Sequence, residues 1–248
     1  DLHLSLRRQR QMCIRDSAMS VVKRTAEKKN ANLYVIGKDI KFHIHRSDLR
    51  GTDISVESIN RTYKGIHIPL IGEHQVINAC CAIGAIDLLR DYADMNITTK
   101  DVIKGIASTR WAGRMEILRE HPTILLDCAH NTDGMSALRK GIEKFFNKKT
   151  IMVVGLSEDK DVLNMVKEIK DIAKYVVITR TKMVNRAMDT AKIQKTLSKW
   201  IPLNKMKIIP DVANAVSHAL SISDADDIVC ITGSIFVVGE AREYLVKN

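Results

Sequence analysis

Between residues 31 and 70, apolar and polar positions alternate with a period of two. The alternation runs through ANLYVIG, IKFHIH, GTDISVESI and TYKGIHI, and this pattern is typical of half-buried strands. Gly37-Lys38-Asp39 and Arg50-Gly51-Thr52 offer turns between these runs. We therefore predict an antiparallel meander over residues 31–70.

The segment after Gly72 has a helical rather than a strand pattern. Residues 73–89 are rich in alanine and other small side chains, so the predicted helix must pack closely against its neighbours. Thr99 is placed to cap a further short helix. The stretch STRWAGRM at residues 108–115 then interrupts the periodicity, and we predict a boundary between a domain at 18–110 and a domain at 111–248.

Beyond this boundary, short apolar runs alternate with helix-length segments. One of these segments places Met135, Leu138, Ile142 and Phe145 on a single helical face. Alternating β and α units predict a mainly parallel sheet with helices on both faces, which is a Rossmann-like α/β domain. The predicted strands are TILLDCA, IMVVG, YVVITR, MKIIP and DIVCITG.

Polar side chains follow the first of these strands at once. Asp127 ends the apolar run TILLD, and Asn131 and Thr132 stand at the start of the next predicted helix. Ligands of parallel α/β sheets lie beyond the carboxyl ends of the strands, where helix N-termini present unpaired amides. The sequence therefore predicts a ligand edge, although Asp127 could simply end the strand and Asn131 or Thr132 could simply cap the helix.

Composition narrows the class of protein. Hydrophobic residues make up 45% of the chain and charged residues 27%, as in an ordinary soluble globular protein. No apolar run approaches the roughly 20 residues that a membrane helix needs. The five cysteines are odd in number and contain no C-x-x-C pair, which argues against a disulfide framework or a zinc site and for the reducing cytoplasm.

The net charge of +10 suggests an anionic partner, such as a nucleotide, a polycarboxylate or a nucleic acid. The basic residues are scattered, and aromatic residues amount to only 4% of the chain. A surface that stacks nucleic acid bases needs aromatic side chains among its cations. We therefore expect no nucleic acid partner, and a basic, solvated surface is the plain alternative to any anion site.

The first seventeen residues, DLHLSLRRQRQMCIRDS, fit neither domain. They have no helical or strand period, and they lack the apolar core of a signal peptide. The ending MCIRDS resembles translated sequencing-adapter read-through. We expect residues 1–17 to be a non-native leader and the native protein to begin further upstream.

Three motifs together resemble one family. GEHQVINACCAIGAI, WAGRMEIL followed by LLDCAHN, and the terminal TGSIFVVGEAR occur in order. The chain from residue 18 to 248 is similar to folylpolyglutamate synthase/dihydrofolate synthase, the folate branch of the Mur ligase superfamily. Two positions depart from the pattern, since the family commonly has Pro where this chain has Ala112 and Gly where it has Cys128.

The resemblance implies a fold and a reaction. Residues 18–110 would be the rear part of a P-loop-type ATPase domain, and residues 111–248 the Mur-ligase-type C-terminal domain. ATP would phosphorylate a carboxylate of a folate or of dihydropteroate, and the amine of L-glutamate would attack the acyl phosphate. The implied cofactors are ATP and Mg²⁺, the implied partners are these small molecules, and the implied state is a monomer.

No G-x-x-x-x-G-K-[ST] phosphate loop occurs in the sequence. The resemblance places that loop and the magnesium ligands upstream of Ala18, so we expect the chain to be inactive alone. Two other functions stay open at this point. One is a Mur-type ligase of cell-wall synthesis, and the other is a non-catalytic module that binds nucleotides or anions.

The resemblance also implies roles for individual residues. Asn78 would contact the adenine nucleotide, Arg114 would reach its phosphates, and Asp127 would accept hydrogen bonds from ribose hydroxyls. The plain alternatives are a helix-surface amide, a solvated linker arginine and a strand-end carboxylate.

Two further residues would serve the reacting groups. His130 in the motif AHN would face the phosphate or the incoming glutamate. Ser234, in the turn that opens the last helix, would help to hold a glutamate carboxylate on backbone amides. A structural histidine and an ordinary helix cap are the plain alternatives.

Overall fold

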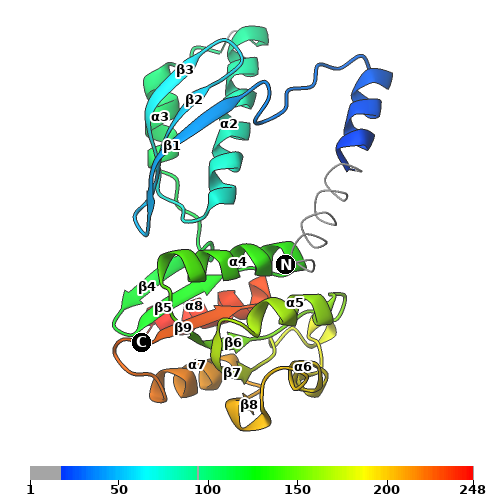
Figure 1. The fold of residues 1–248 in the computed structure, drawn as a ribbon, viewed down its shortest axis with the longest axis vertical. Helices are drawn as coiled ribbons and strands as arrows, with labels where there is room; N and C mark the ends of the chain where they lie inside the picture. Colours follow the sequence, from blue (N-terminus) through cyan, green and yellow to red (C-terminus); the bar gives the residue numbers. More distant parts are fainter. Residues whose placement is uncertain (1–17, 94, 248) are drawn as a thin grey trace, which may run out of the picture.

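A computed structural model describes residues 18–93 and 95–247 of the chain. The expected non-native leader at 1–17 lies outside the described residues. After a helical stretch at 18–28, the chain forms one sheet of three strands and one of six. Figure 1 shows the smaller sheet with its two helices above and the larger layered unit below.

The smaller sheet is the predicted antiparallel meander. Its strands run in the order β1 (Lys41–Asp48), β2 (Gly51–Glu57) and β3 (Thr62–Ile68). One part of the prediction is wrong: residues 31–35, within ANLYVIG, form no strand, and only an isolated bridge joins Ile36 to Ile40. An apolar run becomes a strand only where a second backbone pairs with it.

Two helices pack beside this sheet, α2 (Glu73–Tyr92) and α3 (Thr99–Ala107). Small residues allow α2 to approach closely, because a Cβ added at Gly84 would lie 2.4 Å from Cδ1 of Ile40. The cap of α3 is displaced by one residue from the prediction. Thr98, rather than Thr99, is the N-cap, and it forms a capping box with Asp101.

The larger sheet has the order β4-β5-β9-β6-β7-β8. All its neighbouring strands are parallel except β4, which pairs antiparallel with β5. The predicted α/β fold with a mainly parallel sheet is confirmed. Its elements are β4 (Glu116–Glu120), β5 (Thr123–Asp127), α4 (Thr132–Phe145), β6 (Thr150–Val154), α5 (Val162–Ile169), β7 (Ala173–Ile178), η1 (Val184–Arg186), α6 (Thr190–Leu197), η2 (Leu203–Lys205), β8 (Met206–Ile208), α7 (Val212–Ser221), β9 (Ile228–Thr232) and α8 (Ile235–Lys247).

Side chains of the larger sheet alternate between two apolar cores. Leu125 and Met152 belong to the core beneath α4, α5 and α6, whereas Leu126 and Val153 belong to the core beneath α7 and α8. All four of these side chains are fully buried. Because both faces of the sheet are covered, its strands appear in sequence as continuous apolar runs.

Strand β4 was not predicted from the sequence. It is a short edge strand whose outer end is exposed, and its pairing with β5 is irregular between Ile117 and Arg119. Its residues therefore lack both a clean alternation and a continuous apolar run. The strand continues directly from residues 108–115, which form the linker between the two sheets. It therefore ties the end of this linker, residues 113–115, to the edge of the larger sheet.

The unit built on the smaller sheet and the unit built on the larger sheet meet beside the start of α2. The side chain of Ile71 packs in the core beneath α4, together with Met115. An ion pair of 2.9 Å joins Lys144 Nζ at the end of α4 to Glu73 Oε1 at the start of α2. No helix within the described part of the chain is long and apolar enough to cross a membrane.

Candidate functional site

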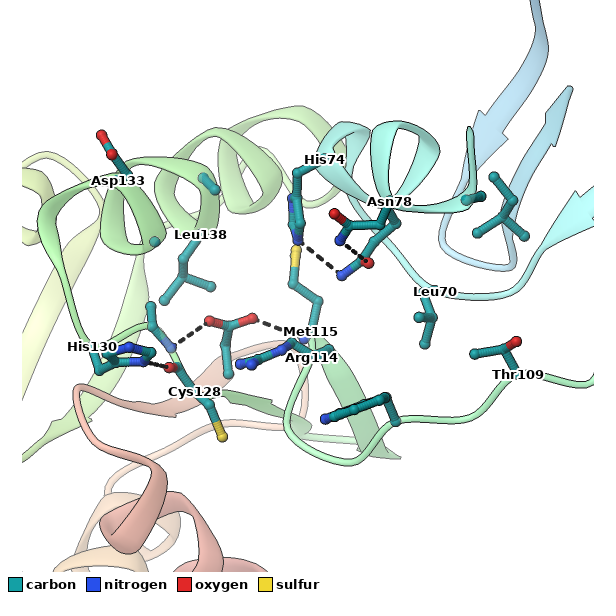
Figure 2. Close-up of a pocket in the computed structure, with 18 of the residues that line it drawn as sticks. Leu70, His74, Asn78, Thr109, Arg114, Met115, Cys128, His130, Asp133 and Leu138 are labelled. Carbon is teal, nitrogen blue, oxygen red and sulfur yellow. Dashed lines mark hydrogen bonds between the residues drawn. The ribbon is translucent and has the colours of Figure 1, made fainter. Parts of the chain in front are cut away.

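A cavity of about 780 Å³ opens where the two units meet. Its lining comes from α2, from the linker between the sheets, and from the loop that joins β5 to α4 (Figure 2). Four of the five predicted site residues line it, namely Asn78, Arg114, Asp127 and His130. Residues that lie far apart in the sequence therefore converge on one space.

Helix α2 contributes a row of polar side chains to the cavity. Asn78 Nδ2 donates to Gln75 Oε1 at 3.1 Å, and Gln75 Nε2 lies 2.9 Å from His74 Nε2. Burial is the main cause that lowers the pKa of His74, and the nearby positive charge of Arg114 adds to it. Burial therefore favours the uncharged form of His74, and Asn78 belongs to an ordered polar row.

The linker presents Arg114 between two residues with unusual backbone angles. Gly113 has φ 67° and Met115 has φ 45°, a left-handed region that costs energy for a side chain such as that of Met115. A Cβ at Gly113 would also lie 2.6 Å from Cys128 Sγ. The linker thus makes a tight turn against β5, and Arg114 points from that turn into the cavity (Figure 2).

Asp127 is a buried carboxylate whose two oxygens both accept backbone hydrogen bonds. Met115 N donates to Oδ2 at 2.9 Å, and Ala129 N donates to Oδ1 at 2.8 Å. Burial raises the pKa of Asp127 to about 6, although the two amides and the charge of Arg114 oppose the shift. Asp127 does more than end a strand, because it fastens the linker to the end of β5.

His130 and Asn131 follow at the start of α4. His130 Nδ1 donates to the Cys128 carbonyl at 2.9 Å, so Nε2 is the ring nitrogen that remains for a ligand. Asn131 is the N-cap of α4, since its Oδ1 accepts from Gly134 N at 2.7 Å. The first turn of α4 faces the cavity, and helix N-termini favour anionic groups.

Ser234 is placed apart from the other four residues. It does not appear among the side chains that line the cavity. Its side chain is buried, and its Oγ accepts from Phe236 N at 3.3 Å in the turn that opens α8. This is the geometry of a helix start, so a ligand in the cavity would contact Ser234 only if it extended along the sheet edge.

Carboxylate, thiol and imidazole side chains do not gather into a metal cluster in the described part of the chain. In residues 18–93 and 95–247, no group of three or more His, Cys, Asp or Glu side chains is arranged to hold a metal ion. A Mg²⁺ ion that is bound through nucleotide phosphates needs only one or two protein carboxylates.

Sequence reasoning missed several lining residues, including His74, Gln75, Thr109 and Trp111. The signal for His74 and Gln75 was present, because they lie four and three positions before Asn78 and so share its helical face. Trp111 is 65% exposed and belongs to the linker. A single exposed aromatic is common on protein surfaces, so the sequence alone gave no signal for Trp111.

Comparison with known proteins gives the family of the larger unit. Residues 113–235 match the family described as Mur ligase, glutamate ligase domain, and they belong to that family. The chain is 27% identical over 196 residues to the dihydrofolate synthase/folylpolyglutamate synthase of Bacillus subtilis (strain 168), which covers 79% of this chain. Along most of its length, the chain is therefore homologous to the folylpolyglutamate and dihydrofolate synthases.

Solved structures share this fold. The folylpolyglutamate synthase of Thermotoga maritima superimposes with a TM-score of 0.74 at 25% identity over 92% of this chain. The Mycobacterium tuberculosis folylpolyglutamate synthase complexed with ADP and AMPPCP has a TM-score of 0.80 at 24% identity over 91% of this chain. The chain spans 44% of the Bacillus protein and 52% of each solved chain.

Proposed function

We propose that this chain forms part of an ATP-dependent ligase that joins L-glutamate to a folate or to dihydropteroate. The observation that carries the proposal is the convergence of Asn78, Arg114, Asp127 and His130 on one cavity from separate elements. The names of the homologous synthases supply the reaction class. We favour a ligase of the folate branch over a Mur-type ligase of cell-wall synthesis and over a non-catalytic binding module.

The nucleotide lies along the cavity in this proposal. The amide of Asn78 recognises the adenine, and the planar guanidinium of Arg114 matches the paired oxygens of a phosphate. Each oxygen of Asp127 accepts one backbone amide and retains room for a second donor. Asp127 can therefore accept ribose hydroxyls without releasing the linker.

His130 serves the incoming glutamate in this arrangement. Its Nδ1 donates to the Cys128 carbonyl, so Nε2 is the ring nitrogen that can meet a ligand. An amine must lose its proton before it attacks an acyl phosphate, and an acceptor within reach assists that loss. We therefore place His130 at the reacting groups, where Nε2 in its unprotonated form would meet the glutamate amine.

The reaction needs activation because a carboxylate is a poor electrophile until it carries a good leaving group. The γ-phosphate of ATP passes to the carboxylate, and attack by the glutamate amine expels phosphate and forms the amide. A cleft between two units keeps the acyl phosphate from water. We place Ser234 at the glutamate carboxylate, which requires the substrate to extend along the sheet edge beyond the cavity.

The proposal includes a low affinity for ATP in the chain taken alone. Most phosphate affinity in such sites comes from a phosphate loop, its lysine and a metal ion, and the loop motif does not occur in the sequence. We expect dissociation constants in the millimolar range and no turnover. Cytoplasmic location and action as a monomer on small molecules, with no nucleic acid partner, complete the proposal.

A chimera tests the function. In the Bacillus synthase, the region that matches this chain is replaced by residues 18–248, and ATP-dependent addition of labelled glutamate to dihydropteroate and to tetrahydrofolate is measured. We expect product with at least one acceptor, and at least a tenfold lower rate when Arg114 is replaced by Ala. A folded chimera that binds ADP but makes neither product would contradict the ligase function.

A further inference from the structure

The linker turn around Arg114 is fastened to the larger unit on both sides. Gly113 O accepts from Cys128 N at 2.8 Å, and Gly113 N donates to Glu116 Oε2 at 2.8 Å. On the other side of Arg114, Met115 N donates to Asp127. Three hydrogen bonds therefore hold the backbone on either side of a single cavity-lining arginine.

One of these bonds depends on a residue from the end of the chain. Arg242 in α8 lies against the Glu116 carboxylate, with Nε 3.1 Å from both oxygens and Nη2 3.0 Å from Oε1. The hydrogen bond to Glu116 also raises the pKa of Arg242. The Arg242 guanidinium fixes the Glu116 carboxylate, which in turn accepts the hydrogen bond from Gly113 N. The motifs WAGRMEIL and GSIFVVGEAR therefore meet in space.

We propose that Glu116 and Arg242 are positioning residues for Arg114. They act through the backbone of Gly113 and do not line the cavity. Gly113 and Met115 both have positive φ, and such a turn persists only where its surroundings hold it. If the ion pair between Glu116 and Arg242 is lost, the turn becomes mobile and must be ordered each time a phosphate binds. That ordering lowers the affinity for the phosphate.

The position of the pair favours this role over a general contribution to stability. The Arg242 side chain is 41% exposed, and that of Glu116 is 19% exposed. Ion pairs with one partner so open to water contribute little to folding. Removal of Arg242 should therefore leave the fold intact and loosen the turn alone.

The proposal rests on the proposed nucleotide site, so its test measures the turn and the binding separately. Arg242→Ala, Arg242→Lys and Glu116→Gln are made in the whole chain. Lys247→Ala is the matched control, because it removes an exposed ion pair to Glu243 on the same helix. Affinities for ADP and for adenosine are measured by NMR titration, and hydrogen exchange is followed at the Gly113 amide.

We expect Arg242→Ala to speed exchange at Gly113 and to weaken ADP binding roughly fivefold. Adenosine affinity should not change, because adenosine has no phosphate for Arg114. Glu116→Gln and Arg242→Lys should retain part of the ADP affinity, and Lys247→Ala should match the parent. Adding Arg242→Ala to Arg114→Ala should cause no further loss.

Two outcomes overturn the proposal in different ways. If the parent binds ADP and Arg242→Ala leaves its affinity unchanged, or lowers ADP and adenosine affinity equally, the pair does not position Arg114. If the parent does not bind ADP at all, the nucleotide site itself fails, and the positioning role fails with it. Because the parent is measured in both cases, the two failures are distinguishable.

Discussion

Replacing Asp127 by Asn should change how the stability of the chain depends on pH. The carboxyl is 8% exposed, and burial raises its pKa from an ordinary 3.8 to about 6. Between these values the folded chain holds the proton more tightly than the unfolded chain does. The contribution of Asp127 to the free energy of unfolding therefore falls as the pH rises from about 4 to 6.

The size of the effect follows from the two pKa values. A tenfold change in proton affinity corresponds to about 1.4 kcal/mol, so the ionised Asp127 costs roughly 3 kcal/mol of stability at pH 7.5. Asn has nearly the same shape and does not titrate. It keeps one acceptor for Met115 N or Ala129 N and turns an NH₂ group toward the other, which is a penalty that does not vary with pH.

Urea unfolding followed by circular dichroism at pH 4.5 and 7.5 measures the effect. From pH 4.5 to pH 7.5, the parent should lose roughly 2 kcal/mol of unfolding free energy relative to Asp127→Asn. Asp211→Asn, at the N-cap of α7, controls for the loss of one carboxylate. A difference that stays constant between the two pH values would refute the reasoning.

Two other predictions concern the linker. Gly113→Ala should lower the unfolding free energy by about 2 kcal/mol or more, because the new Cβ meets Cys128 Sγ and the residue keeps a positive φ. Thermal unfolding measures the loss, and Cys128→Ala in the same chain should recover part of it. A loss that Cys128→Ala does not change would contradict the contact. Limited proteolysis should cut first within residues 108–112 and leave a resistant core that begins near Met115. A resistant core that runs uncut through Trp111 would count against the proposed boundary.

The sequence predicted the larger sheet well because burial on both faces produces an unmistakable pattern. Runs such as IMVV at 151–154 are apolar at every position and are bounded by helix-length segments. The failures have a physical cause as well. Residues 31–35 have a strand-like composition but no strand pairing, and β4 pairs at an edge where apolar residues are few. Pairing partners are a tertiary property that local pattern does not encode.

The site was predictable where chemistry follows topology. The rule that ligands lie beyond the carboxyl ends of strands pointed to Asp127 and Asn131, and both line the cavity. His130, which also lines it, was predicted from the family resemblance alone. The positive φ of Met115 could not be predicted, because methionine rarely adopts it. The contact between Glu116 and Arg242 joins residues 126 positions apart, and only the fold brings them together.

The central claim is that a nucleotide binds in the cavity between the two units. NMR chemical-shift mapping of the isotope-labelled chain with ADP tests it most directly, because this method detects millimolar binding. We predict saturable shifts at the amides of Asn78, Arg114 and residues 127–131, and weaker binding in Arg114→Ala. Shifts that are absent, or that gather at a surface away from these residues, would contradict the account.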